Sequence, residues 1–305
     1  CVGAALGIYR LSKTLGKSTY IVMDKDCPAI EPIVEGIYKE RAEEEEDIFV
    51  TNEEALLLKD KSAMLIVVDV NLPAMTECPE LLKSVSTIVV LDHHRQNNET
   101  IKNAVVSYVE PYASSTCEMV AEILQYIVDK PKLKNIEADA MYSGILVDTD
   151  NFVIKAGVRT FEAAAFLRRA GADVTRVRKM FREDMEHCRI RTAIINKAEI
   201  YMNEFAISTF DGANVSGATV VGAKAANALL NIQGIRGSFV LTSLQDCIYI
   251  SARSIDELNV QVIMEKFNGG GHLTMAAAQL KDVTLEEAKQ QLEDVLQQMR
   301  EDGDI

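Results

Sequence analysis

The chain has 305 residues, of which 48% are hydrophobic and 26% charged, and its net charge is −14. So acidic a protein is not expected to bind long nucleic acid through its general electrostatic field, although a small anionic substrate can still bind at a local site. The length predicts two domains with substantial cores. No apolar run reaches the roughly 18 residues that a transmembrane helix requires. The six cysteines lack C-x-x-C spacing, which is typical of reduced cytosolic thiols.

The first part of the chain alternates short apolar runs with helical patterns. Strands are expected over the apolar runs at residues 17–23, 47–50, 63–69, 88–92 and 104–109. Helices are expected at residues 3–15, from Asn52, and at residues 117–128 and 138–147. This alternation predicts an α/β fold with a parallel sheet. The acidic run at residues 43–46 is expected to be solvated.

The second part of the chain has helical patterns first and strands later. Helices are expected at residues 160–169, 174–182 and 185–201, of which the last would connect two domains. A second, smaller α/β unit then follows, with these expected elements: a strand at 205–209, a helix at 218–230, a strand pair at 237–244 and 247–252, and helices at 260–267 and 285–300. A glycine run at residues 269–271 follows the helix expected at 260–267 and ends in His272.

Polar residues follow two of the buried strands and one buried helix. The strand at 88–91 is followed by four of them: Asp92, His93, His94 and Arg95. Asp69 ends the preceding strand, and Asp148 ends a helix. Ligands of open α/β sheets bind outside the carboxyl ends of the strands, and carboxylates with imidazoles suit Mn²⁺, Fe²⁺ or Zn²⁺. Two such ions can generate a hydroxide and stabilise a pentavalent phosphorus. The alternative is that these residues only cap the ends of the elements.

Several segments carry a family resemblance. The segment VVLDHHR, preceded by VVDVN and followed by VDTDNF, resembles the DHH phosphoesterase superfamily, and the segment GGGH at residues 269–272 resembles its companion DHHA1 domain. Three longer segments resemble the GdpP-type class, which are membrane-anchored cyclic-di-AMP phosphodiesterases with a degenerate GGDEF domain: YVEPYASSTCEMVAEILQY, SARSIDELNVQVIMEKFNGGGHLTMAAAQL and GILVDTDNF. The resemblance covers essentially the whole chain. It implies a DHH domain over residues 1–185, a helical connection over 186–202 and a DHHA1 domain over 203–305, with the active site in the cleft.

The resemblance implies a metal centre of two divalent ions, with Mn²⁺ as the first choice. The expected ligands are Asp69 as the bridging carboxylate and His93 and Asp148, one for each ion. Family members carry a further loop of the form H-x-x-x-D-x-D just before the helix that begins in this chain at Gly3. Cys1 matches the residues after that loop, so we expect Asp69, His93 and Asp148 alone to hold two ions poorly.

The remaining site residues are expected to act on the substrate. Asp92 would orient the imidazoles, and His94 would contact a phosphate oxygen or the attacking hydroxide. Arg95 either binds a phosphate or faces solvent. Phosphate contacts in the second domain are expected from these residues: Arg253, Ser254, Gly269, Gly270, Gly271 and His272. The cluster at residues 114–116 is expected to cap a helix, with a phosphate contact as the alternative.

The resemblance implies hydrolysis of cyclic-di-AMP to linear pApA. The alternatives are an oligoribonuclease or 3′-phosphoadenosine 5′-phosphate phosphatase of the same superfamily, and a nucleotide-sensing module without catalysis. The expected partner is a cyclic dinucleotide, without long nucleic acid and without direct membrane contact from this part of the protein, and a homodimer is left open. We expect a module facing the cytoplasm, in a parent protein anchored in the bacterial membrane.

Overall fold

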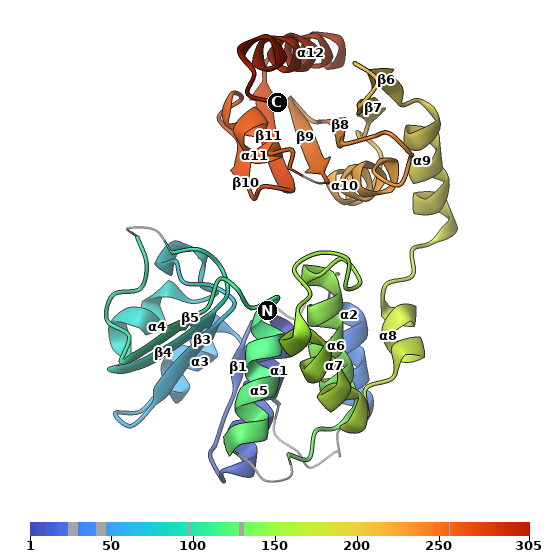
Figure 1. Ribbon diagram of the computed structural model, residues 1–305. Coiled ribbons are helices and arrows are strands. Elements are labelled where there is room, and N and C mark those ends of the chain that lie inside the picture. Colours follow the sequence, from blue (N-terminus) through green and yellow to red (C-terminus); the bar gives the residue numbers. More distant parts are fainter. Residues whose placement is uncertain (24–29, 41–46, 97–98, 128–130, 256) are drawn as a thin grey trace. The chain divides into compact units, whose positions relative to one another are not determined.

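The computed structural model describes all residues except 24–29, 41–46, 97–98, 128–130 and 256, so the acidic run expected at residues 43–46 lies outside the described residues (Figure 1). The described residues form two compact units, Cys1–Arg182 and Glu183–Ile305. Each unit has its own hydrophobic cores, so each is described by itself.

Unit 1 contains the parallel strands that the alternating sequence pattern predicts. β3 (Met64–Val68), β4 (Thr87–Asp92) and β5 (Val106–Val109) form one parallel sheet with β4 in the centre. β1 (Ile21–Val22) and β2 (Phe49–Val50) form a second parallel pair. The central strand is the most buried of its sheet, which explains why its sequence is a continuous apolar run. The α/β fold with a parallel sheet is therefore confirmed.

The helices of unit 1 pack beside these strands. Their bounds are α1 Val2–Thr14, α2 Glu31–Glu40, α3 Asn52–Leu58, α4 Pro79–Ser84, α5 Thr116–Ile127, α6 Asn135–Asp148, α7 Val158–Arg169 and α8 Val174–Met180. A 3₁₀ turn covers Pro73–Met75. α1, α5 and α6 share one core and lie unusually close at Cys117. A Cβ atom at Gly144 would lie 2.4 Å from the Cys117 sulfur, and one at Gly3 would lie 2.4 Å from the Ala140 oxygen. Only glycine permits this approach.

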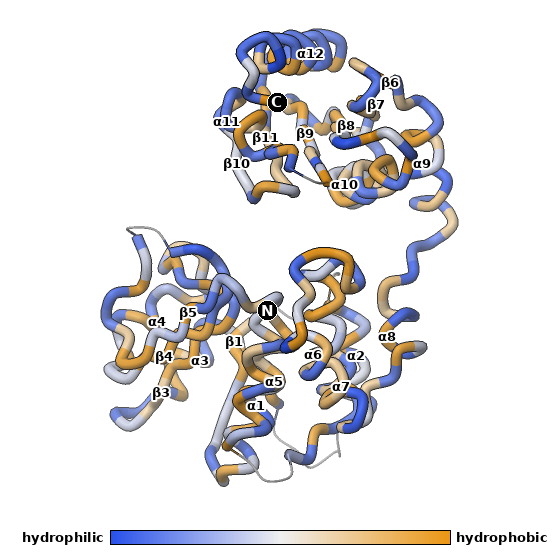
Figure 2. Tube along the Cα trace, viewed as in Figure 1, coloured by the Kyte–Doolittle hydropathy of each residue, from blue (hydrophilic) through white to orange (hydrophobic). Residues whose placement is uncertain are grey.

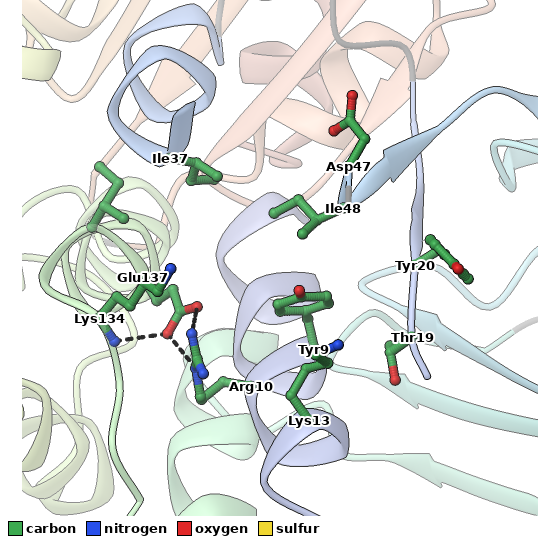
Figure 3. A pocket seen from close by; sticks show the side chains of 11 residues that line it. Tyr9, Arg10, Lys13, Thr19, Tyr20, Ile37, Asp47, Ile48, Lys134 and Glu137 are labelled. Carbon is green, nitrogen blue, oxygen red and sulfur yellow. Dashed lines mark hydrogen bonds and ion pairs between the residues drawn. The ribbon is translucent and has the colours of Figure 1, made fainter. Parts of the chain in front are cut away.

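A cavity of about 290 Å³ lies in unit 1, between α1, the β1–β2 pair, α2 and the start of α6 (Figure 3). Arg10 forms a two-pronged ion pair with the buried Glu137, with nitrogen–oxygen distances of 2.8 and 2.6 Å. Glu137 also accepts a 2.8 Å hydrogen bond from the Lys134 backbone. The ion pair therefore stabilises the start of α6. None of the expected metal ligands lines the cavity, so the candidate metal site lies elsewhere in unit 1.

Unit 2 is built on a six-stranded sheet. The order is β10 (Gly270–Gly271), β11 (Met275–Lys281), β9 (Cys247–Ser254), β8 (Gly237–Leu244), β7 (Phe205–Asp211) and β6 (Glu199–Tyr201). Neighbouring strands are antiparallel except β7 and β8, which are parallel. The expected antiparallel pair of β8 and β9 is confirmed.

Four helices on two separate cores complete unit 2. Their bounds are α9 Met185–Asn196, α10 Ala218–Leu229, α11 Val260–Glu265 and α12 Leu285–Asp302. α12 shows why this arrangement follows from sequence. Its buried residues recur every three or four positions: Ala288, Leu292, Leu296 and Met299. Figure 2 shows the resulting alternation of hydrophobic and hydrophilic colour along α12.

The helix expected over residues 185–201 is shorter in the structure. α9 ends at Asn196, and residues 199–201 form β6, which pairs with β7. Residues 199–201 therefore belong to the sheet of unit 2, where their backbone groups form hydrogen bonds with β7 instead of continuing α9. Within the described residues, no helix combines the length and the apolar character that crossing a membrane requires.

Candidate active site

Asp92 organises the turn that follows β4. Its side chain is fully buried. Oδ1 accepts hydrogen bonds from the backbone N–H groups of His93 (2.8 Å) and His94 (3.2 Å), and lies 2.7 Å from His94 Nδ1. Oδ2 accepts a 2.6 Å bond from Asn71 Nδ2. Asp92 therefore caps the strand end and orients an imidazole at the same time, so the two interpretations that the sequence left open both describe it.

Asp69 follows β3 with a backbone conformation that is rare for a residue with a side chain. Its φ of 66° lies in the left-handed region, which costs roughly 1–2 kcal/mol for a residue other than glycine. Its N–H donates to the Leu91 carbonyl at 2.8 Å, which holds this conformation. Asp69 Oδ1 lies 3.6 Å from His93 Nε2 and accepts a 2.7 Å bond from Thr116, and Oδ2 lies 2.7 Å from the Cys1 ammonium. Strain in the backbone thus directs this carboxylate toward His93.

The two carboxylates near His93 differ in their affinity for protons. Burial alone would raise the pKa of Asp69, whereas the hydrogen bond from Thr116 and the neighbouring His93 act to lower it. Burial, followed by the negative charge of Asp69, raises the pKa of Asp148 to about 6. Asp148 is therefore the carboxylate that gains a proton as the pH falls through about 6.

The two imidazoles also differ. Burial and the neighbouring His94 lower the pKa of His93, so its neutral form is favoured. The hydrogen bond to Asp92 is the main cause of the raised pKa of His94, so its protonated form is favoured. A neutral imidazole can offer a nitrogen lone pair to a metal. His93 Nδ1 lies 3.4 Å from the Ala113 carbonyl, and a proton at Nδ1 leaves the lone pair on Nε2, which faces the carboxylates.

These residues form a donor set that fits a divalent metal ion. Asp69, His93 and His94 each offer one ligand atom, and the three atoms lie within 4.8 Å of one another. Asp148 Oδ2 lies 3.8 Å from His93 Nε2. Carboxylate oxygens with an imidazole nitrogen suit Mn²⁺ and its neighbours. The structure thus brings together the three expected ligands, and it adds His94 to their surroundings.

Arg95 is exposed just beyond this turn. Its guanidinium is accessible both to solvent and to a phosphate, and the phosphate contact of Arg95 stays a prediction.

The glycine run of unit 2 forms a hairpin. Gly270 and Gly271 make up β10 and pair with Ala277 and Ala276 of β11, so part of the glycine run belongs to the sheet of unit 2. Gly271 has a φ of 151°, and a Cβ there would lie 2.4 Å from the Met275 oxygen. A Cβ on Gly269 would lie 2.2 Å from the Ala277 oxygen, whereas one on Gly270 would meet no atom within 4 Å. The hairpin therefore requires glycine at residues 269 and 271.

Arg253 and Ser254 lie beside this hairpin. Arg253 is the register partner of Met275 on β11, and Met275 also accepts a 2.6 Å hydrogen bond from the His272 backbone. His272 itself is exposed. Ser254 is buried, and its hydroxyl donates to the Leu258 carbonyl at 2.7 Å. The hydroxyl of Ser254 is therefore bonded inside the unit, which argues against the direct phosphate contact expected of it. Arg253, the glycine run and His272 share one end of the sheet.

Two residues of the site have roles that sequence patterns did not indicate. Asn71, in the segment VVDVN, holds Asp92. Thr116 belongs to the cluster expected to cap α5, but the capping group is Ser115, whose Oγ accepts a 3.1 Å bond from the Glu118 N–H. Thr116 bonds to Asp69 instead. Two signals could have identified these residues. Thr116 is a polar residue next to one that already caps the helix, and Asn71 is a polar residue two positions after the acid that ends a strand.

Both units of the chain match known domain families. Residues 1–145 match the DHH family, N-terminal domain, and residues 206–301 match the DHHA1 domain. The chain is 42% identical to the cyclic-di-AMP phosphodiesterase PdeA of Listeria monocytogenes, over 95% of this chain and 44% of that protein. It is 40% identical to the cyclic-di-AMP phosphodiesterase GdpP of Geobacillus thermodenitrificans, over 99% of this chain and 46% of that protein. The chain thus spans less than half the length of these relatives.

Among solved structures, an exopolyphosphatase-related protein from Bacteroides fragilis shares the fold. Its TM-score is 0.79 and its sequence identity 18%, over 97% of this chain and 88% of that one.

Proposed function

Since the chain belongs to the family of proteins that join a DHH domain to a DHHA1 domain, we propose that it is a metal-dependent phosphodiesterase that hydrolyses cyclic-di-AMP to linear pApA. The observation that carries the proposal is the convergence of Asp69, His93 and His94, with Asp148 beside them, in unit 1. The relatives named as cyclic-di-AMP phosphodiesterases support the substrate, because their similarity extends over nearly the whole of this chain.

Asp69, His93 and Asp148 would contribute ligands to a centre of two metal ions, with Mn²⁺ as the physiological choice, and the H-x-x-x-D-x-D loop that family members carry would supply the other ligands. A divalent cation bound there supplies Lewis-acid chemistry, because it neutralises phosphate charge and acidifies water. The lowered pKa of His93 prepares this ligand, since a neutral imidazole can bind a metal ion without first losing a proton.

His94 is the residue of this site suited to donate a proton or a hydrogen bond. Asp92 fixes its Nδ1 and raises its pKa, so the imidazolium form persists to a higher pH than that of a free histidine. We assign His94 to a phosphate oxygen of the substrate, where its positive charge would stabilise the negative charge that develops as the phosphorus is attacked.

Unit 2 would bind the nucleotide. Residues 269–271 let a phosphate approach the backbone closely, and Arg253 and His272 bring basic side chains to the same end of the sheet. Ser254 would support the hairpin from inside. The homodimer and the membrane anchoring of a parent protein stay predictions.

Product analysis tests the proposal. A protein that includes the H-x-x-x-D-x-D loop of the family ahead of Cys1 is incubated with cyclic-di-AMP and Mn²⁺, and the nucleotides are separated by chromatography. We expect pApA to form, and we expect EDTA or the substitution His93→Ala to prevent it. Faster cleavage of a short oligoribonucleotide or of 3′-phosphoadenosine 5′-phosphate would favour the alternative enzyme. Tight nucleotide binding without any turnover would favour a sensing module.

A further inference from the structure

Thr116 is the first residue of α5, and its side chain contacts the candidate metal centre. It is 1% exposed. Its Oγ1 lies 2.7 Å from Asp69 Oδ1, and because an ionised carboxylate can only accept hydrogen bonds, the hydroxyl must donate. Ser115 already caps α5, so the structure of the helix does not require a hydroxyl at residue 116.

The oxygen that accepts this bond is the one that faces His93. Asp69 Oδ1 lies 3.6 Å from His93 Nε2. A carboxylate oxygen has two lone pairs, so the bond from Thr116 leaves one of them for another partner. The contacts of Asp69 with the exposed Cys1 are made by the other oxygen, Oδ2, so Thr116 is the buried hydroxyl that fixes Oδ1 about a side-chain torsion that is broad for aspartate.

We propose that Thr116 is a positioning residue, whose hydroxyl fixes the orientation of Asp69 so that Oδ1 presents its remaining lone pair to a divalent metal ion. This inference rests on the proposed function, because it assumes that Asp69 binds metal. Thr116 does not itself bind the ion or the substrate. Its contribution is to reduce the freedom that Asp69 would otherwise lose on binding the metal.

The start of α5 is built to hold such a group in place. Glu118 is buried and accepts hydrogen bonds from Ser114 Oγ at 2.5 Å and from Thr160 Oγ1 at 2.6 Å. These bonds tie the first turn of α5 to the segment before it and to α7. The Thr116 hydroxyl is thus carried by backbone that is fixed on both sides, which a positioning contact requires.

Thr160 provides a matched control for Thr116. Both are buried threonines of unit 1 whose hydroxyl donates to a carboxylate, but Thr160 donates to Glu118 and not to Asp69. Thr116→Val and Thr160→Val therefore remove the same chemical group at nearly constant volume. Thr116→Ser restores the hydroxyl, and Thr116→Ala is a smaller substitution in case valine prevents folding.

Each protein is titrated with Mn²⁺ alone, and binding is monitored by electron paramagnetic resonance. Thermal unfolding of the same proteins without metal is measured in parallel. Loss of a hydrogen bond to a metal ligand typically weakens metal binding about 10- to 100-fold. We expect a loss of this size in Thr116→Val and Thr116→Ala and affinity close to that of the unchanged protein in Thr116→Ser. Thr160→Val should show a lower Tm and a clearly smaller loss of affinity, because it loosens the start of α5 but keeps the bond to Asp69.

The outcomes separate this inference from the proposed function. If the unchanged protein binds Mn²⁺ and the folded Thr116→Ala and Thr116→Val proteins bind it equally well, the role of Thr116 is refuted and the metal centre stands. If Thr160→Val weakens binding as much as Thr116→Val, the effect belongs to the packing of α5 and the inference again fails. If a protein with unchanged Thr116 that also includes the H-x-x-x-D-x-D loop of the family binds no Mn²⁺, the proposed metal centre itself is refuted.

Discussion

The two candidate sites differ in what holds their functional groups. In unit 1 the groups are side chains, and three of them are fixed by a hydrogen bond with another side chain: Asn71 fixes Asp92, Asp92 fixes His94, and Thr116 fixes Asp69. In unit 2 the candidate groups lie on an exposed hairpin whose shape depends on glycine at two positions.

This difference determines how each site should respond to substitution. A site of mutually bonded side chains should be sensitive to chemistry at constant volume, because a single lost donor frees or unbalances a buried carboxylate. A site in which backbone segments lie close together should be sensitive to the volume of a new side chain, because even one added carbon atom clashes with the neighbouring strand. The following predictions test this distinction.

The largest effects are expected at the histidine pair. His93→Ala should remove a metal ligand and lower kcat on cyclic-di-AMP by about a thousandfold or more, with a parallel loss of bound Mn²⁺. His94→Ala should lower kcat by roughly 100- to 10,000-fold and keep the metal, as expected for a residue that transfers or shares a proton. Steady-state kinetics and metal analysis of the same samples measure both quantities. Equal metal loss in the two variants would show that His94 is also a ligand.

An intermediate effect is expected at Asn71. Asn71→Leu keeps the approximate volume but removes the 2.6 Å bond to Asp92, so Asp92 would hold His94 less firmly. We expect kcat to fall about 10- to 100-fold with a smaller change in KM. Asn103→Leu is the control, because its amide donates to the Leu82 carbonyl, remote from Asp92. Similar losses in both variants would mean that the effect is only one of stability.

A smaller effect is expected from adding one carbon atom to the hairpin. Gly271→Ala places a Cβ 2.4 Å from the Met275 oxygen in a backbone conformation that alanine avoids. We expect KM for cyclic-di-AMP to rise about tenfold, which corresponds to a strain of roughly 1–2 kcal/mol, while kcat changes little. Gly270→Ala has open space around its Cβ and is the matched control. A larger effect at Gly270 than at Gly271 would indicate that the ligand, not the hairpin, excludes the side chain.

The smallest effect concerns pH and His187 in unit 2. Its Nδ1 lies 2.5 Å from Asp184 Oδ2 and its Nε2 lies 2.9 Å from the Ser216 carbonyl. Both partners are acceptors, so the protonated ring satisfies both, and the Ser216 carbonyl followed by Asp184 raises the pKa of His187. This stabilisation is fully present below the unfolded pKa of about 6.5 and is lost as the pH rises through the higher folded pKa.

Thermal unfolding across pH 6 to pH 9 tests this expectation. The Tm of His187→Ala should be lower than that of the unchanged protein at the acidic end, and the two values should converge at the alkaline end. A difference in Tm that does not depend on pH would show that His187 contributes packing alone.

The sequence predicts best those features that depend on neighbouring residues. The parallel strands, and the acids that follow β3 and β4, could be read from short apolar runs that end in polar residues. β6 was missed because three residues after a long helix carry too little pattern to distinguish strand from helix. β10 was missed because two glycines favour no strand, and they pair only because β11 lies beside them.

The contacts within the site depend on the fold and could not be predicted in the same way. Thr116 and Asp69 are 47 positions apart in the sequence, and no local rule indicates that the first residue of one helix meets the end of a particular strand. The left-handed backbone of Asp69 is equally hidden, because an aspartate there has no local reason to adopt a φ of 66°. Ser254 shows the converse, since the hydroxyl of a residue in a recognisable motif donates to the interior of the unit.

The glycines around Cys117 have a consequence for how this protein can vary. Gly3 and Gly144 determine how deeply the Cys117 side chain fits among α1, α5 and α6, and Thr116 is the residue next to it in α5. A methyl group at residue 144 would press on the Cys117 sulfur of α5, and one at residue 3 would press on the Ala140 carbonyl of α6 and then on the same sulfur. Either change would disturb the start of α5 and the hydroxyl that contacts Asp69. A screen of all single substitutions should therefore find these two glycines nearly as intolerant as the charged residues of the site, although they have no functional group.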